Sequence, residues 1–375
     1  MRLTANLETQ MSRMTNSLGP VFLLLLSAGA AAPIEPRDLP ALPPEPFAAV
    51  KDHKKTYYAQ FTPDSKSLAL KDSNDAVRLY DLETRQLGPV VVEGLGHGQF
   101  TLSPCGRFLL KATDWLGPKF QAPAGFRIGE CNLVLWDIKT GQPLDSTLST
   151  CKPEPEPYPL FAPDGSRFYY VNPDNAVGVW DTAKRAGAGT FKGPPTPISA
   201  FALSADGKQL AVASLAAGPS GRLDVWDTAK AERVHTFELK WSKYRLAFLP
   251  DGKTLLAAGP VQVNRNRQGM VLAEHGIRRF DMVGGKELDP LPLSGRLQRI
   301  GVTTFRLSPD GRTGFLIGAS GGFYLIDPQT GKEVGPGWIR LWFPDLLISA
   351  DGKYVAGTGS DGACVYTTES LLKAK

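Results

Sequence analysis

Apolar and polar residues alternate in short runs along this chain, most regularly over residues 198–230. The run Ala200 to Ser204 has the period of two that predicts a half-buried strand. Asp206-Gly207 follows, a pair typical of a hairpin turn because glycine accepts the positive φ that tight turns need. The next strands of this unit are expected at Gln209–Ser214, Leu223–Asp227 and Val234–Leu239.

The unit recurs seven times. The hairpin turns are Asp64-Ser65, Cys105-Gly106, Asp164-Gly165, Asp206-Gly207, Asp251-Gly252, Asp310-Gly311 and Asp351-Gly352. They are spaced by about 41, 59, 42, 45, 59 and 41 residues, which fits repeats of roughly 40–45 residues with two insertions. One four-stranded sheet cannot bury both of its faces alone, so the copies are expected to stack into a ring.

The third strand of each unit ends in a bulky residue, usually followed by Asp. These pairs are Tyr80-Asp81, Trp136-Asp137, Trp180-Asp181, Trp226-Asp227, Phe280-Asp281, Ile326-Asp327 and Tyr366-Thr367. Thr-Gly-Gln or Thr-Gly-Lys follows two of them, at 140–142 and 330–332. On these residues the chain resembles the WD-repeat (WD40) β-propellers, as an exported bacterial-type member. The resemblance implies an all-β fold over residues 46–375, a seven-bladed propeller of four-stranded antiparallel blades.

The chain departs from that family in one respect and suggests how the ring closes. The family's Gly-His before the first strand occurs once, at Gly96-His97. The last unit stops after its third strand, near Tyr366, and residues 46–50 have the register of a missing fourth strand. The resemblance implies that this N-terminal segment completes the seventh blade, which removes an exposed sheet edge.

Residues 1–32 have the pattern of a secretory signal peptide. Arg2 and Arg13 precede the apolar run 21–26, and small residues follow it, with cleavage expected after Ala30. The true start is Met11 or Met14 in an alternative interpretation; an uncleaved anchor or an over-long reading frame are others. Residues 33–45 form a proline-rich linker. We therefore expect an exported protein, periplasmic or secreted, without a membrane span in the mature chain.

Composition argues against several functions. The net charge is +5, from 42 basic and 37 acidic residues, and no basic run stands out, so nucleic acid binding is not expected. The four histidines match no compact metal-ligand spacing. No glycine-rich phosphate loop and no nucleophile elbow is present. We expect no cofactor, no metal and a monomeric chain.

Two of the four cysteines are candidates for a disulfide bond. Cys131 opens the third strand of the second unit, and Cys151 lies about equally far beyond the turn at Thr140. A hairpin would bring them together, and an exported protein allows oxidation. The alternative is a pair of free buried thiols.

Candidate binding residues gather in segments expected on one face. The insertions Thr113–Glu130 and Pro260–Gly276 both join second and third strands, and the segments between blades lie on the same face; loops on rigid scaffolds often carry function. Tryptophan and arginine are favoured interface anchors. The candidates are Trp115, Phe120, Phe126, Trp241, Arg265, Arg267, Trp338, Arg340 and Trp342, with Arg245 in a similar segment. In the alternative interpretation these side chains pack the insertions onto the blades.

Three functions remain open. The first is a non-catalytic scaffold that binds a protein or peptide partner on the insertion-bearing face. The second is an exported hydrolase or lactonase with a polar site in the central channel, which would need carboxylates and histidines at the inner ends of the blades. The third is a carbohydrate or cell-surface binding module using Trp115, Trp338 or Trp342. Fold alone does not choose among them.

Overall fold

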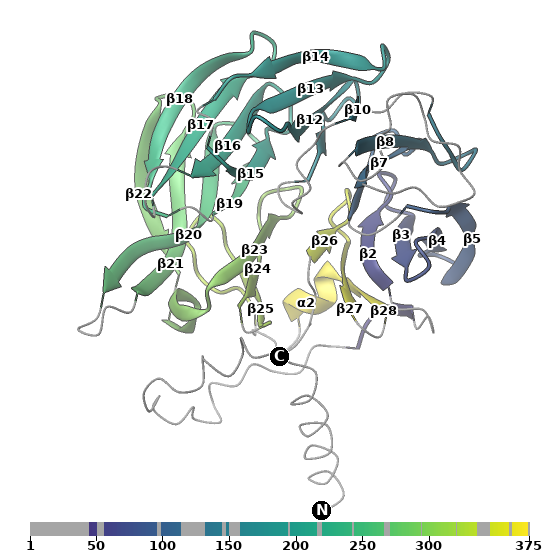
Figure 1. The fold of residues 1–375 in the computed structure, drawn as a ribbon. Helices are drawn as coiled ribbons and strands as arrows, with labels where there is room; N and C mark the ends of the chain where they lie inside the picture. The colour runs from purple at the N-terminus through teal and green to yellow at the C-terminus, as the bar shows by residue number, and fades with distance from the viewer. Residues whose placement is uncertain are drawn as a thin grey trace, which may run out of the picture. The chain divides into compact units, whose positions relative to one another are not determined.

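Seven antiparallel β-sheets make up the described part of the chain (Figure 1). All of the described residues belong to one compact unit, Pro40–Lys375. The computed structural model describes residues 45–50, 56–95, 99–113, 132–144, 148–149, 158–193, 196–215, 220–241, 244–265, 271–293, 295–319, 321–335, 346–359 and 362–373.

Each sheet is a blade, and the blades are numbered here in chain order from the first hairpin turn. Blade 1 is β2 (Thr56–Phe61), β3 (Ser67–Asp72), β4 (Val77–Asp81) and β5 (Gln86–Val92). Blade 2 is β6 (Phe100–Leu102), β7 (Phe108–Thr113) and β8 (Asn132–Asp137), with the short β9 (Gln142–Pro143) and β10 (Leu148–Ser149) both pairing with β8. Blade 3 is β11 (Leu160–Phe161), β12 (Arg167–Val171), β13 (Val177–Asp181) and β14 (Ala186–Phe191). Blade 4 is β15 (Ile198–Leu203), β16 (Gln209–Leu215), β17 (Gly221–Asp227) and β18 (Glu232–Leu239).

The remaining blades complete the ring. Blade 5 is β19 (Arg245–Phe248), β20 (Thr254–Arg265), β21 (Val271–Asp281) and β22 (Lys286–Pro292). Blade 6 has three described strands, β23 (Val302–Leu307), β24 (Gly314–Gly318) and β25 (Phe323–Ile326), and follows the 3-10 helix η3 (Gly295–Arg299). Blade 7 is β26 (Leu346–Ile348), β27 (Tyr354–Gly359) and β28 (Gly362–Thr367), with β1 (Ala48–Val50) as its outer strand. The seven-bladed propeller expected from the sequence is confirmed.

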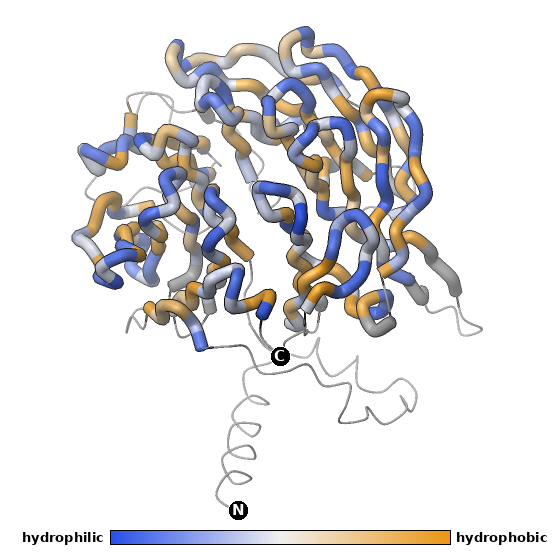
Figure 2. The backbone as a smooth tube through the Cα atoms, turned by 180° about the vertical axis from the view of Figure 1, so that it is seen from behind, coloured by the Kyte–Doolittle hydropathy of each residue, from blue (hydrophilic) through white to orange (hydrophobic). Residues whose placement is uncertain are grey.

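Strands of the blades bury both of their faces. In β16, Leu210 and Val212 pack toward blade 3, whereas Ala211 and Ala213 pack toward blade 5. Hydrophobic and hydrophilic stretches follow one another along the backbone (Figure 2). Because successive side chains of a strand point to opposite faces, each blade needs a neighbour on both sides.

Seven hydrophobic clusters therefore separate the seven blades, one between each adjacent pair. The bulky residue at the end of each third strand packs onto the preceding blade. Trp136 contributes to the cluster between blades 1 and 2, Trp180 to that between blades 2 and 3, and Trp226 to that between blades 3 and 4. The repeat position is thus the contact that joins one unit to the unit before it.

The N-terminal strand meets the C-terminal strand in blade 7. Ala48 lies opposite Val365, and Val50 lies opposite Ala363, in antiparallel register. Both β1 residues are buried in the cluster between blades 7 and 1. Residues far apart in the sequence thus share one sheet, at the place where the sequence analysis expected the N-terminal segment.

Two features differ from the sequence expectation. The insertion Pro260–Gly276 was expected as a loop, and this is wrong for most of it: β20 and β21 continue as one long hairpin, with Arg265 opposite Val271. The reason is the alternation of Val261 and Val263 with polar residues, which keeps the strand period beyond the blade. The chain also ends in a short helix that the sequence pattern did not reveal, α2 (Thr368–Lys373), whose Leu371 is buried against blades 6 and 7.

Candidate functional site

A cavity of about 640 Å³ lies where all seven innermost strands converge. Its lining includes residues of β2, β6, β11, β15, β19, β23 and β26, each of which is the inner edge of its sheet. Because every blade contributes, the cavity occupies the centre of the ring. Its volume lies in the range of typical ligand pockets, about 300–1,000 Å³.

Six polar side chains of the lining fall on two levels, defined by the number of residues between each of them and the hairpin turn of its blade; Thr62, Ser199, Thr303 and Thr304 also line the cavity. Gln99, Tyr158 and Arg245 stand six residues before Cys105, Asp164 and Asp251, respectively, and form the outer level. Gln60, Thr101 and Arg306 stand four residues before Asp64, Cys105 and Asp310, respectively, and form the inner level. Residues two apart on a strand share a face, so both levels belong to the same side of their strands.

The outer level is nearer to the insertion-bearing face. Arg245 pairs with Ala258, and β20 runs on from there to Arg265 at the tip of the long hairpin. The start of the innermost strand and the connection between second and third strands therefore lie at the same end of the blade. Arg245 consequently marks the end of the cavity on the side of the long hairpin of blade 5.

Two lining side chains bridge neighbouring blades. Arg245 Nε donates a hydrogen bond of 2.6 Å to the carbonyl oxygen of Thr303, from blade 5 to blade 6. Gln60 Oε1 accepts a hydrogen bond of 2.8 Å from the N–H of Leu102, between blades 1 and 2. These bonds orient the guanidinium and the side-chain amide at the wall of the cavity.

The described lining carries positive charge. Arg245 is half-buried and Arg306 is exposed, and they are the ionisable residues among the described lining residues apart from Tyr158. Elsewhere the wall presents hydroxyl, amide and apolar groups. Such a wall can donate hydrogen bonds and attract an anion, and guanidinium groups bind carboxylates in a bidentate manner.

The structure locates only part of the residue set expected on the insertion-bearing face. Trp241 follows β18 and is half-buried against the cluster between blades 4 and 5. Arg265 ends β20 at the hairpin tip. The other candidates lie outside the described residues: Trp115, Phe120, Phe126, Arg267, Trp338, Arg340 and Trp342. The contacts of Trp241 agree with the alternative interpretation for that residue, a packing role.

Several cavity residues were missed by the sequence analysis. Predicted inner strands contain or adjoin Gln60, Gln99 and Arg306. A polar residue in such a strand is ordinarily interpreted as facing solvent. The available signal was the number of residues between each of these side chains and the hairpin turn of its blade, because equal spacing from the turn predicts equal depth in the ring. Among the described residues, no group of histidine, cysteine, aspartate and glutamate has the geometry to hold a metal ion.

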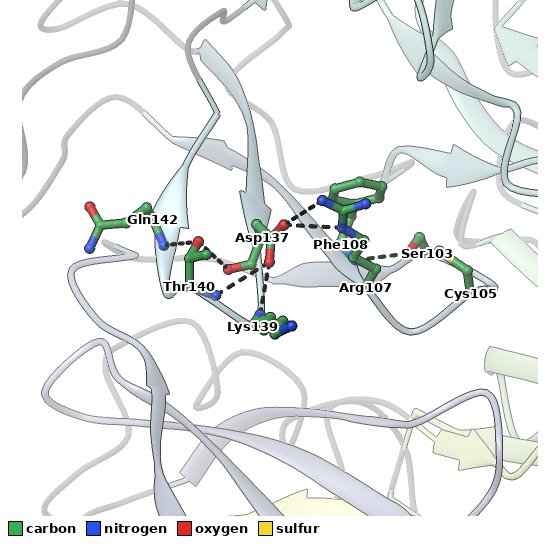
Figure 3. Close-up of polar contacts among 8 residues, drawn as sticks. All are labelled: Ser103, Cys105, Arg107, Phe108, Asp137, Lys139, Thr140 and Gln142. Atoms are coloured by element: carbon green, nitrogen blue, oxygen red, sulfur yellow. Dashed lines mark hydrogen bonds and ion pairs between the residues drawn. The ribbon is translucent and has the colours of Figure 1, made fainter.

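The turn of blade 2 holds a second polar cluster (Figure 3). Cys105 stands where the other six turns carry Asp, and its Sγ lies 3.2 Å from Ser103 Oγ. In blade 4 the equivalent Asp206 accepts hydrogen bonds from the Ser204 hydroxyl and the Lys208 N–H. Cys105 thus occupies a position at which the other six turns have the carboxylate of an aspartate.

That environment acts on the thiol. Burial raises the pKa of Cys105, but the Ser103 hydroxyl, the Arg107 N–H and the Arg107 charge together lower it below its ordinary value. Arg107 also pairs with Asp137, at 3.0 Å between Nη2 and Oδ2. Asp137 in turn accepts hydrogen bonds from the N–H groups of Lys139 and Thr140 (Figure 3). The cluster therefore ties the first hairpin turn of blade 2 to the end of its third strand.

Neither Cys131 nor Cys151 lies among the described residues, so their disulfide stays a prediction. The adjoining strands are described: Ser149 of β10 lies opposite Asn132 of β8. Cys105 and Cys364 do not take part in a disulfide.

Comparisons with known proteins leave the fold and the cavity as the basis for any functional argument. No protein-family model matches the chain, and no curated protein matches it. Within the described part of the chain, no helix has the length and apolar character needed to cross a membrane.

Proposed function

We propose that this chain is a non-catalytic binding scaffold of the WD-repeat type, which holds a protein or peptide partner at its insertion-bearing face. The observation that carries the proposal is the central cavity, which opens among the seven inner strands and is walled by groups suited to hydrogen bonding and charge attraction. The seven inter-blade clusters make the wall a fixed frame. A rigid frame lowers the ordering cost of binding.

The WD-repeat assignment rests on the repeat positions. The Asp that follows the bulky residue accepts backbone hydrogen bonds from the next turn in several blades, as Asp227 does from Ala229 and Lys230. Asp181 accepts one from Lys184, and Asp81 accepts one from Thr84. The Asp position therefore has one recurring role, to shape the turn into the outer strand, and the bulky residue has another, to pack on the preceding blade.

The insertion-bearing face is tested by comparing partner capture from the native envelope fraction. The variant Trp115→Ala/Trp338→Ala should lose partners that the wild type retains, with an unchanged melting temperature. Val283→Ala is a matched control, because Val283 is exposed and lies in the turn between β21 and β22. Equal capture by the tryptophan variant and the wild type would reject this face as the binding surface. Unfolding of the variant would assign these tryptophans to packing instead.

We also propose that the chain is exported, on the signal-peptide pattern of residues 1–32. N-terminal sequencing of the protein from its native cell should find a mature chain that begins after Ala30. A protein that retains residues 1–30 in the cytoplasm would contradict export.

A further inference from the structure

We propose that the central cavity binds an acidic peptide segment, with one carboxylate at Arg245 and a second at Arg306. The inference deepens the proposed function and rests on it, since it names the chemistry of the partner segment. It starts from the placement of the two guanidinium groups on adjacent blades, both in the wall of the same cavity.

The two arginines stand at different levels of the cavity wall. Arg245 belongs to the outer level and Arg306 to the inner level, so the two differ by two residues along neighbouring inner strands. At about 3.3 Å per residue, two residues span about 6.6 Å. Side chains i and i+2 of an extended peptide repeat at the same distance on one face. Along the strand direction the two offsets are equal, so a peptide with two acidic residues separated by one residue is a suitable probe of both levels.

The remaining polar groups of the wall suit such an occupant. Gln60 uses its Oε1 to accept the Leu102 N–H, which leaves its amide N–H groups as the donors at the inner level. Gln99 adds an amide at the outer level. The inner strands are also the inner edges of their sheets, so their backbones border the cavity. An acidic peptide could thus receive donors from both sides of the ring.

The guanidinium of Arg245 is held in place before any ligand arrives. Its Nε donates to the Thr303 carbonyl oxygen at 2.6 Å, and Thr303 Oγ1 donates to the Ile317 carbonyl oxygen at 3.1 Å. This chain of bonds links β19, β23 and β24. An arginine fixed by its Nε loses less conformational entropy when it binds a carboxylate.

The test is isothermal titration calorimetry of the purified full chain with a capped peptide, acetyl-Gly-Glu-Ser-Glu-Gly-amide. We expect measurable binding at low salt that weakens as ionic strength rises. The glutamine version of the peptide should bind at least about tenfold more weakly, since hydrogen bonds to charged groups are the stronger ones. Equal binding of the two peptides would overturn the assignment of an acidic ligand. Succinate bound as tightly as the glutamate peptide would overturn the assignment of a peptide.

Variants assign the binding to the cavity. Arg306→Ala and Arg245→Lys should each weaken the glutamate peptide by about tenfold. Arg312→Ala is the matched control, because Arg312 is 87% exposed in a hairpin turn away from the cavity lining, and it should bind like the wild type. Arg306→Ala is the decisive variant if Arg245→Lys proves unstable. Unchanged affinity in a folded Arg306→Ala protein would overturn the inference.

The outcomes separate this inference from the proposed function. Peptide binding that depends on Arg306, without any partner capture by the wild type, would support the acidic site and reject the scaffold function. A different result would reject only the acidic site: partner capture depends on the insertion-bearing face, and the affinity for the peptide is the same in the wild type and in Arg306→Ala.

Discussion

The indole ring of Trp226 lies against the phenyl ring of Phe191, with the ring centroids 5.5 Å apart. Trp226 ends the third strand of blade 4, and Phe191 ends the outer strand of blade 3. The repeat tryptophan Trp226 therefore makes a contact between blades, and only 6% of its surface is exposed. Its loss should affect the junction between two blades.

Trp226→Ala should lower the free energy of unfolding by about 3–5 kcal/mol, because it leaves a large cavity between blades 3 and 4. Urea denaturation followed by circular dichroism measures the change. Val283→Ala serves as the control, since Val283 is 76% exposed and should change stability by no more than about 0.5 kcal/mol. A Trp226→Ala protein as stable as the control would contradict the packing role.

Deleting residues 46–50 should sharply lower the melting temperature. The deletion removes β1, with the buried Ala48 and Val50, and leaves the outer edge of β28 unpaired. We expect a loss of about 3 kcal/mol or more, from apolar burial and the sheet hydrogen bonds. Deleting five residues of the linker, 35–39, is the control of equal length, and differential scanning calorimetry gives both values. An unchanged melting temperature after deletion of 46–50 would show that β1 does not stabilise the ring.

Stability should fall in acid because of the aspartates in the turns. Hydrogen bonds from the Ser204 hydroxyl and the Lys208 N–H hold the pKa of Asp206 below its ordinary value of about 3.8. Asp310 and Asp164 have lowered pKa values for similar reasons. A carboxyl group with a depressed folded-state pKa stabilises the protein above the unfolded-state value, and that contribution disappears as the pH falls through the folded-state pKa.

The expected result is a urea midpoint that is stable near neutral pH and drops below about pH 4. Asp206→Asn removes one contributing carboxylate, so the variant should be less stable than the wild type at neutral pH. Its free energy of unfolding should also decrease less than that of the wild type when the pH is lowered. A midpoint that does not change between pH 7 and pH 3 would contradict the role of these carboxylates.

Cys105 should react with iodoacetamide at a lower pH than an ordinary exposed thiol, because its pKa is lowered and the thiolate is the nucleophile. Arg107→Ala should slow the reaction at a given pH, since the variant loses the positive charge beside the sulfur. Lys139→Ala is the control: it removes a nearby charge, but Lys139 contacts Asp137 through its backbone N–H. Peptide mass spectrometry distinguishes Cys105 from Cys364. Equal rates for the wild type and Arg107→Ala would show that Arg107 does not tune the thiol.

Cys131 and Cys151 should be joined in protein purified from an oxidising compartment. Non-reducing peptide mapping should then find one linked pair, and Cys131→Ser should be less stable than the wild type by about 2–4 kcal/mol. The same substitution in reduced protein is the control and should have a smaller effect. Two freely alkylated thiols in the native protein would contradict the disulfide.

Much of the fold follows from local patterns in the chain. Residues 210–213 form a continuous apolar run because successive side chains face different neighbouring blades, and that run is visible in the sequence. The Asp206-Gly207 turn is equally local, since glycine at position 207 adopts a φ of 71°. Seven copies of such signals determine the number of blades, because each copy must bury the same two faces. The helix α2 escaped prediction, because six residues show no clear helical period and its burial comes from blades 6 and 7.

The sequence by itself determined the repeat, the strands and the hairpin turns, since these depend on residues close together in the chain. Only the tertiary structure decided that Gln60, Gln99, Arg245 and Arg306 line one cavity, because they come from four different blades. The long hairpin of blade 5 is an intermediate case: the alternation at Val261 and Val263 is present in the sequence, and the structure adds the register, with Arg265 opposite Val271. Closing the ring brings together polar residues whose separation in sequence gives no sign of their proximity.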